Sequence, residues 1–298
     1  MKEKLKTFFL PSLIFLSIFS LFTNAQTKVL KIGAIPDQNQ EFLDRRFNLL
    51  SEELSKELKI KVQYVPVVNY VSAVTGFRTK VLDFVWFGGL TGAQARLQTP
   101  NSIVIAQRNI DKEFKSVFIV NKKLNLPQAK KLNDLKALKG LRFTFGSENS
   151  TSGRLMPEYF LNKAGIKVTD FKGKKPGFSG SHDATIVLVN SGSFEAGVLN
   201  KQVWEKNLIE NPKRTKNLYA FFITPEYADY HWLAQGDLDN KFYKGFTNKL
   251  KETILNLSNN DSNQKKILKM FNAKKFINTD VKQYSNIESI GRKLKKIR

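Results

Sequence analysis

The sequence contains no cysteine and only two histidines, His182 and His231. The absence of cysteine excludes a disulfide framework, thiolate zinc sites and a lipid-modified cysteine after a leader segment. Two histidines also exclude a histidine-rich metal site. We therefore predict a protein with no metal site and no cofactor.

Long apolar runs are equally scarce, and only Phe8 to Phe22 is nearly continuous. Three lysines precede this run within the first six residues, and small residues ending at Ala25 follow it. This order is typical of a cleavable signal peptide, which we place at 1–25. A transmembrane anchor is the alternative, disfavoured by the short run and by Pro11. An exported chain that carries no lipidated cysteine suits a bacterial periplasm.

Acidic residues are few beside basic ones, with 26 Asp and Glu against 49 Lys and Arg and a formal charge of +23. The electrostatic field of such an excess of positive charge attracts anions in general. Nucleic acid is a poor fit, because the chain is exported and no basic stretch is interleaved with stacking aromatics. The basic run 292–298 is most simply a solvated, partly frayed helix end.

Segments with strand and helix periodicity alternate along most of the chain. Strand patterns lie at 30–35, 60–67, 82–87, 102–107, 114–120, 141–145, 194–199 and 219–223. Helical spacing lies at 41–59, 70–80, 91–97, 155–165, 184–190, 242–257 and 267–276. Alternation of this kind is typical of parallel βαβ units, in which ligands sit at the carboxyl ends of the strands.

The chain without its signal is long enough for two domains of ordinary size. We predict an α/β clamshell, with lobe 1 formed by 26–114 and 229–298 and lobe 2 by 115–228. Two crossings join the lobes, and the aromatic-rich segment 224–232 is expected to be the returning loop. A ligand would be buried between the lobes when they close.

The stretch from Leu141 to Phe160 organises this scheme. A strand pattern leads through a polar turn into a helix whose first turn carries the hydroxyls of Ser150, Thr151 and Ser152. Unpaired N–H groups and the positive end of the helix dipole can surround a small oxyanion there without any lysine. The alternative is a plain N-cap, where Ser and Thr are favoured in any case.

Several motifs together resemble the phosphonate- and phosphite-type substrate-binding proteins of ABC importers. They are TFGSENSTSG at 144–153 with LMP at 155–157, FSGSHDATIVLV at 178–189, EAGV at 195–198, VNY at 68–70, DFVWFG at 83–88 and TPEYADYHW at 224–232. The resemblance implies a type II periplasmic binding fold that clamps one tetrahedral oxyanion. It also implies a membrane permease as partner.

The resemblance implies ligand contacts as well. Ser150, Thr151 and Ser152 match the anion-binding helix start, Tyr70 a cleft tyrosine and His182 the histidine of the second lobe. The residues themselves agree, because an imidazole at a helix start can donate to an anion oxygen. A histidine satisfied by local backbone and a core tyrosine are the alternatives.

Two further candidates are Asp229 and Tyr230. A phenol such as that of Tyr230 can donate to a buried polar ligand. A carboxylate such as that of Asp229 repels an anion unless an oxygen of the ligand is protonated and donates to it. Asp229 would then select a P–OH group, and a solvated loop aspartate is the alternative.

The sequence departs from the family at two places. Gly92 follows the segment 86–91, where the family often has tyrosine, and 199–203 reads LNKQV, without the carboxylate found in members that take aminoalkylphosphonates. We therefore predict phosphite or methylphosphonate as ligand, with phosphate, another phosphonate or a sulfonate as alternatives.

No catalytic motif is evident, because the chain lacks a G-x-S-x-G elbow and a phosphate-loop lysine. We therefore predict a binding protein rather than an enzyme, and a monomer. An exported enzyme acting on phosphorylated substrates, with His182 and Asp183 as acid and base, is an alternative. A ligand-sensing partner of a membrane kinase is another.

Overall fold

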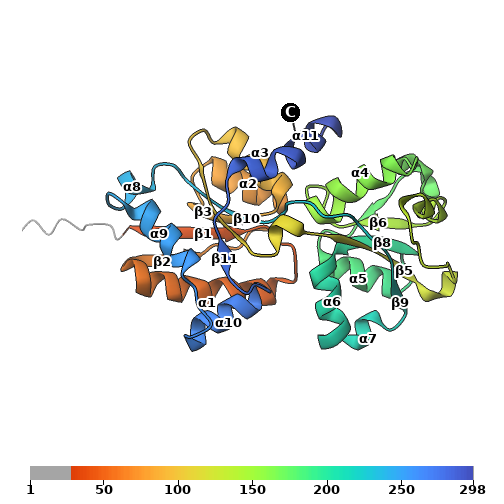
Figure 1. Cartoon of the computed structure of the whole chain (residues 1–298), viewed down its shortest axis with the longest axis horizontal. Helices are drawn as coiled ribbons and strands as arrows, with labels where there is room; N and C mark the ends of the chain where they lie inside the picture. The colour runs from red at the N-terminus through yellow and green to blue at the C-terminus, as the bar shows by residue number, and fades with distance from the viewer. Residues whose placement is uncertain (1–27, 298) are drawn as a thin grey trace, which may run out of the picture.

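The computed structural model describes residues 28–297, so the predicted signal peptide at 1–25 lies outside the described residues. The chain forms two lobes that lie side by side, each built around one β-sheet (Figure 1). None of the helices within 28–297 is long and apolar enough to cross a membrane.

The first sheet has six strands in the order β11-β4-β10-β3-β1-β2. Its strands are β1 (Val29–Ala34), β2 (Lys61–Tyr64), β3 (Phe84–Phe87), β4 (Ile103–Arg108), β10 (His231–Ala234) and β11 (Phe276–Ile277). The helices that follow these strands are α1 (Gln40–Leu58), α2 (Tyr70–Arg78), α3 (Gly89–Gln98), α8 (Leu238–Lys241), α9 (Phe246–Leu255), α10 (Ser262–Met270) and α11 (Ser285–Lys293).

The second sheet has five strands in the order β7-β6-β8-β5-β9. They are β5 (Ser116–Asn121), β6 (Phe143–Phe145), β7 (Gly177–Phe178), β8 (Ala196–Asn200) and β9 (Leu218–Ile223). Its helices are α4 (Met156–Lys163), α5 (His182–Asn190), α6 (Lys201–Glu210) and α7 (Pro212–Thr215), and the π-turn η4 (Thr151–Leu155) precedes α4. Short 3-10 turns occur at Asp111–Glu113, Lys122–Leu124, Leu132–Leu138, Val168–Asp170, Lys172–Lys174 and Val281–Tyr284.

The chain passes from the first sheet to the second after Arg108 and returns after Ile223 (Figure 1). Where the two connecting segments run together, Phe114 and Tyr227 exchange hydrogen bonds of 2.8 and 3.0 Å between their backbones. The two lobes are thus joined by a short, paired connection rather than by a single flexible strand.

Both sheets are mixed, so the prediction of purely parallel units was only partly right. β1 pairs in parallel with β2 and β3, and β6 with β7 and β8. In contrast, β10 runs antiparallel to β3 and β4, and β5 runs antiparallel to β8 and β9. β5 and β10 are the first strands after each crossing. They enter a sheet without a preceding helix to reverse the chain, which is the arrangement that allows an antiparallel partner.

Two local predictions were wrong, and a third was only partly right. The end of the expected loop at 224–232 belongs to β10, whose four residues are all buried at the centre of the first sheet. The expected helix at 267–276 ends with α10, and Phe276 lies in β11. The prediction of a solvated, frayed end for the basic C-terminal run was mostly right, since α11 ends at Lys293 and Arg292, Lys293 and Lys295 are exposed, but Ile297 is buried against Gly291.

The first lobe has one large core, with aromatic side chains at its centre. Trp232 stacks on Phe84 with ring centroids 4.2 Å apart, and Phe47 meets Trp232 edge-on at 6.1 Å. The second sheet is covered on both faces, with separate clusters around Phe143 and Ile186. These cores fix the strand ends from which the residues of the site project.

Candidate functional site

The starts of four helical elements meet between the two sheets. The Leu90 amide at the start of α3 donates to Oγ1 of Thr151, the first residue of η4, at 3.0 Å. The His182 amide at the start of α5 donates to the backbone oxygen of Asp37, after β1, at 2.9 Å. Tyr70 begins α2 and lies within electrostatic reach of Asp37. Helix starts carry unpaired N–H groups and positive dipole ends, so this region favours an anion.

The three hydroxyls at 150–152 are all buried, but the structure gives them different tasks. Ser150 is the N-cap, and its oxygen accepts from the Gly153 amide at 2.9 Å. Thr151 accepts from Leu90, as described above. Within 28–297 the Ser152 hydroxyl has no partner that meets hydrogen-bond geometry, although it lies close enough to the phenol of Tyr227 to lower the pKa of that tyrosine. Ser150 is therefore the N-cap, as the alternative interpretation predicted, while Ser152 keeps a hydroxyl that could donate to an anion.

Tyr70 presents a buried hydroxyl that has no hydrogen-bond partner among the described residues. Burial, aided by the charge of Asp37, raises its pKa well above the ordinary value of a tyrosine, although the Ser150 hydroxyl, which lies close by without the geometry of a hydrogen bond, opposes this rise. The phenol therefore stays protonated near neutral pH and is a hydrogen-bond donor without an acceptor. A buried donor of this kind is rare in folded proteins.

Asp229 lies at the end of the returning segment and is buried. Its Oδ1 accepts from the Gly89 amide at 2.9 Å, while its Oδ2 has no partner within 28–297. Burial raises the pKa of Asp229 to about 7, although the Gly89 amide and the Thr151 hydroxyl oppose this rise. The carboxyl group can therefore accept or donate a proton in a hydrogen bond near neutral pH.

The close packing at this point favours a glycine at position 88. A Cβ atom there would lie 3.1 Å from Oγ1 of Thr151 and 3.2 Å from Oδ1 of Asp229. Gly88 thus allows polar atoms from three separate segments to meet over the start of α3.

His182 and Tyr230 lie together with Asp37. The Tyr230 hydroxyl donates to Oδ2 of Asp37 at 2.8 Å, and Nε2 of His182 lies 3.4 Å from the Tyr230 oxygen. The backbone N–H of Asn200 donates to Nδ1 of His182 at 3.4 Å. Because Nδ1 accepts this hydrogen bond, the proton of the neutral ring is on Nε2. Burial lowers the pKa of His182, so the neutral ring prevails at pH 7.

The residues nominated from the sequence thus lie in one region. Tyr230 is hydrogen-bonded there to Asp37, a residue that sequence reasoning did not nominate. Its phenol is already engaged by Asp37, so it is not a free donor like that of Tyr70. Asp37 directly follows β1, and a carboxylate at the carboxyl end of a parallel strand is the signal that could have identified it.

The two departures from the family pattern have a structural explanation. A Cβ atom at Gly92 would lie 2.2 Å from Cε1 of His231, so the imidazole occupies the space beside α3 that a larger side chain would need. The segment 199–203 crosses from β8 into α6, a helix that sequence reasoning missed. The nearest following carboxylate on that helix, Glu205, forms an ion pair with Lys201.

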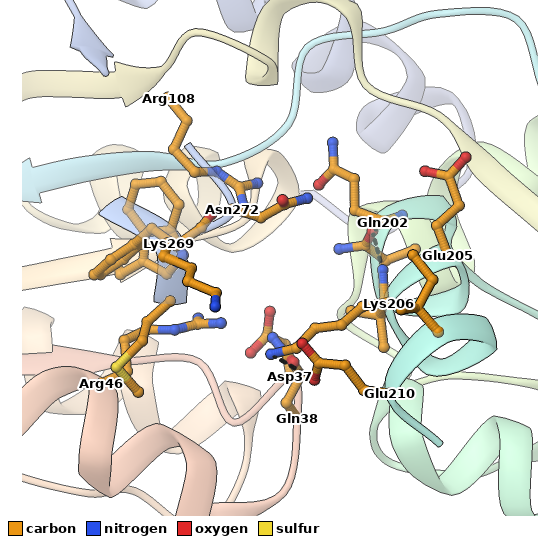
Figure 2. Close-up of a pocket in the computed structure, with 16 residues that line it drawn as sticks. Asp37, Gln38, Arg46, Arg108, Gln202, Glu205, Lys206, Glu210, Lys269 and Asn272 are labelled. Atoms are coloured by element: carbon orange, nitrogen blue, oxygen red, sulfur yellow. Dashed lines mark hydrogen bonds and ion pairs between the residues drawn. The ribbon is translucent and has the colours of Figure 1, made fainter. Parts of the chain in front are cut away.

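A cavity of about 380 Å³ lies beside this region and contains none of the residues nominated from the sequence. Figure 2 shows it between the lobes, with Arg46, Arg108 and Lys269 on one side, Gln202 and Lys206 on the other and Asp37 between them. It adjoins the nominated residues through Asp37, which binds Tyr230.

No group of three or more His, Asp or Glu residues within 28–297 is placed to hold a metal ion. The polar atoms of the site are hydroxyls, amides, an imidazole and carboxyl groups, a donor set that suits an oxyanion rather than a metal.

Comparison with known proteins identifies the family. The family model described as "ABC transporter, phosphonate, periplasmic substrate-binding protein" matches residues 32–284. The chain is 68% identical to the probable ABC transporter phosphite-binding protein PhnD1 of Prochlorococcus marinus (strain MIT 9301), over 99% of each chain. It is 29% identical to the phosphonates-binding periplasmic protein of Escherichia coli (strain K12), over 72% of this chain and 65% of that protein.

Solved structures agree with the predicted fold class. The structure of PhnD1 from P. marinus (MIT 9301) in complex with methylphosphonate has a TM-score of 0.90 and 71% identity, covering 91% of this chain and 99% of that one. The E. coli aliphatic sulphonate-binding protein SsuA shares only the fold, with a TM-score of 0.57 and 14% identity over 91% and 88% of the two chains. The predictions of a two-lobed type II binding fold and of a binding protein rather than an enzyme are confirmed. The chain belongs to the phosphonate-type periplasmic substrate-binding proteins of ABC transporters.

Proposed function

We propose that the protein binds phosphite or methylphosphonate between its lobes and delivers it to the permease of an ABC importer. The observation that carries the proposal is a set of buried polar atoms that lack a partner within 28–297: Oη of Tyr70, Oγ of Ser152 and Oδ2 of Asp229. Leaving such atoms unpaired costs free energy in a folded protein, and a bound oxyanion would satisfy them together.

The hydroxyls of Ser152 and Tyr70 would donate to ligand oxygens. The Nε2–H group of His182 lies 3.4 Å from the Tyr230 oxygen, and we infer that a ligand oxygen would replace this long contact. Asp229 has the opposite role, because its free Oδ2 would accept the hydrogen of a P–OH group. These roles are supported by the burial and hydrogen bonding of each side chain, and by the matching family motifs.

Two observations favour a ligand with a small, uncharged substituent. The start of α6 offers no free carboxylate to an ammonium group, because Glu205 is paired with Lys201. Burying an unpaired ammonium would cost several kcal/mol. The relative that is 68% identical is named as a phosphite-binding protein, and its structure was solved with methylphosphonate.

We place the lobe boundaries at 114/115 and 228/229, and propose that the lobes close as rigid units on the ligand. The sheet composition and the paired crossings support this division. We also propose that a signal peptide at 1–25 directs the chain to the periplasm, where it acts as a monomer. Family membership supports the periplasmic location.

Isothermal titration of one protein preparation with four ligands tests the proposal. Bound anion is first removed by partial unfolding and refolding. We expect phosphite and methylphosphonate to bind best, and 2-aminoethylphosphonate poorly. Phosphate is expected to bind more weakly if the wall that faces its fourth substituent is apolar, since its extra hydroxyl would then be buried unpaired. Tightest binding of 2-aminoethylphosphonate would refute the proposal, and the search for its cation partner would turn to Asp229 and Glu226.

A further inference from the structure

The cavity between α1, α10 and α6 contains a buried cation that forms no ion pair within 28–297, although the carboxylate of Asp37 lies within electrostatic reach of it. Arg46 of α1 is 4% exposed and forms no ion pair with any residue in 28–297. Its guanidinium lies against the rings of Phe42, Phe271 and Phe47, at 4.5, 5.0 and 5.9 Å from their centroids. Its Nε atom is buried and has no hydrogen-bond partner in the same part of the chain.

Such a group is costly unless something compensates its charge. Burial lowers the pKa of Arg46 to about 10, which still leaves the guanidinium charged at neutral pH. The aromatic faces supply part of the compensation. They leave the in-plane N–H groups, which are directed into the cavity, without acceptors (Figure 2).

The other charges of the cavity are mostly neutralised in pairs. Arg108 is paired with Asp111, Lys206 lies 3.7 Å from Glu210, and Glu205 is paired with Lys201. Lys269 of α10, which is exposed, forms no ion pair with another residue of 28–297. The lining therefore has two cations that form no ion pair within 28–297, Arg46 and Lys269.

The carboxylate of Asp37 is near enough to raise the pKa of Arg46, but it forms no ion pair with any residue in 28–297. Its Oδ2 accepts from Tyr230, while its Oδ1 is buried and has no partner among the described residues. A fully ionised oxyanion would be repelled by this atom. An oxyanion that keeps one hydroxyl group could accept from Arg46 and Lys269, and donate to Asp37.

We propose that this cavity is a second anion-binding site, which takes a small oxyanion carrying at least one hydroxyl group, such as dihydrogen phosphate. It is separate from the site of the proposed function, because its lining contains none of the residues 70, 150–152, 182, 229 or 230. Arg46 and Lys269 hold the anion from one lobe. The side-chain amide of Gln202 lines the cavity from the other, and its oxygen is buried with no hydrogen-bond partner among the described residues. An anion that contacts both lobes favours the closed arrangement.

The experiment titrates inorganic phosphate, at pH 6 and constant ionic strength, into a Tyr70→Phe/Ser152→Ala background. These two substitutions remove donors of the proposed primary site. In this background we compare Arg46→Met with Arg45→Met, which removes the same charge from the exposed face of the same helix. A second pair compares Lys269→Met with Lys266→Met on α10, because Lys266 is exposed and outside the cavity.

We expect saturable phosphate binding that is retained in Arg45→Met and Lys266→Met. Loss of a charged hydrogen bond should weaken it about tenfold or more in Arg46→Met. Sulfate, which has no hydroxyl at this pH, should bind more weakly than phosphate. Equal titrations in Arg46→Met and Arg45→Met would overturn the proposal, and so would sulfate binding as tight as phosphate.

Thermal unfolding keeps the test decisive if Arg46→Met proves hard to titrate. Oxyanions stabilise proteins in general by exclusion from the surface, so the control variants set the baseline. We expect phosphate to raise the Tm less in Arg46→Met and Lys269→Met than in their controls. Equal rises in all four variants would show general stabilisation only, and would refute the site. Failure of the proposed function would be seen in a different measurement. Phosphite or methylphosphonate would then bind the Tyr70→Phe/Ser152→Ala variant as tightly as the wild type.

Discussion

Tyr230 donates a hydrogen bond of 2.8 Å to Oδ2 of Asp37, and this bond ties the returning crossing to the end of β1. The equally buried hydroxyl of Tyr70 has no such partner within 28–297. Two tyrosines that look equivalent in the sequence therefore differ in what their hydroxyls do, and this difference can be measured.

We expect Tyr230→Phe to lower the free energy of unfolding by about 1–3 kcal/mol, because Asp37 would keep a buried carboxylate without any hydrogen bond. Tyr70→Phe should leave the stability of the ligand-free protein unchanged, but weaken ligand binding about tenfold. Urea denaturation and calorimetric titration of both variants check this. Loss of stability in Tyr70→Phe without loss of affinity would mean that its hydroxyl is structural.

The serines of the helix start should separate in the same way. Ser150→Ala removes an N-cap hydrogen bond and should cost about 0.5–2 kcal/mol of stability. Ser152→Ala removes a hydroxyl that has no partner in the described protein, so the fold should stay intact while ligand affinity falls about tenfold or more. If Ser152→Ala titrates like the wild type, the anion lies elsewhere.

The pH dependence of stability should report on Asp229. Its pKa is about 7 in the folded protein, against about 3.9 for an ordinary aspartate. Between these values the folded state binds more protons than the unfolded state, so this group makes stability fall as pH rises, by at most about 1.4 kcal/mol per pH unit. Asp229→Asn removes the effect.

The measurement is the free energy of unfolding of ligand-free wild type and Asp229→Asn at pH 5 and pH 8. The difference in free energy of unfolding between the two proteins cancels the contributions of other titrating groups. One of these is His231, whose pKa is lowered by burial to about 4. We expect the wild type to lose stability relative to Asp229→Asn towards pH 8. A constant difference would show that Asp229 has an ordinary pKa.

Much of this fold could be predicted from the sequence because it depends on local patterns. The helix at 41–59 was predicted to within a residue of α1, since its apolar residues recur at helical spacing and Asn39 caps it. The start of η4 was found for the same reason, as the hydroxyls and glycines that shape it are contiguous.

The remainder depended on contacts between distant segments. The four residues of β10 are too few to show a period, and they become a strand because β3 and β4 flank them. Asp37 was missed as a site residue for a similar reason. Its partners Tyr230 and His182 are far away in the sequence, and only the fold brings them together.

Closure of the lobes can be tested through contacts that lie outside the proposed anion contacts. Oδ2 of Asp183 accepts a hydrogen bond of 2.9 Å from the backbone N–H of Asn39, which links the start of α5 to the start of α1. This contact joins the two lobes, so it should stabilise the closed form alone. Asp183→Ala should therefore weaken ligand binding several-fold by favouring the open form, and Asp183→Asn, which keeps an acceptor oxygen, should weaken it less.

Small-angle scattering checks the mechanism behind this effect. The wild type should become more compact on adding saturating ligand, and Asp183→Ala should reach the same compact radius of gyration at higher ligand concentration. A radius of gyration that does not change on saturation of the wild type would contradict closure. Equal affinities of Asp183→Ala and the wild type would show that this contact contributes nothing to the closed state, because a contact found only in that state must shift the equilibrium when it is removed.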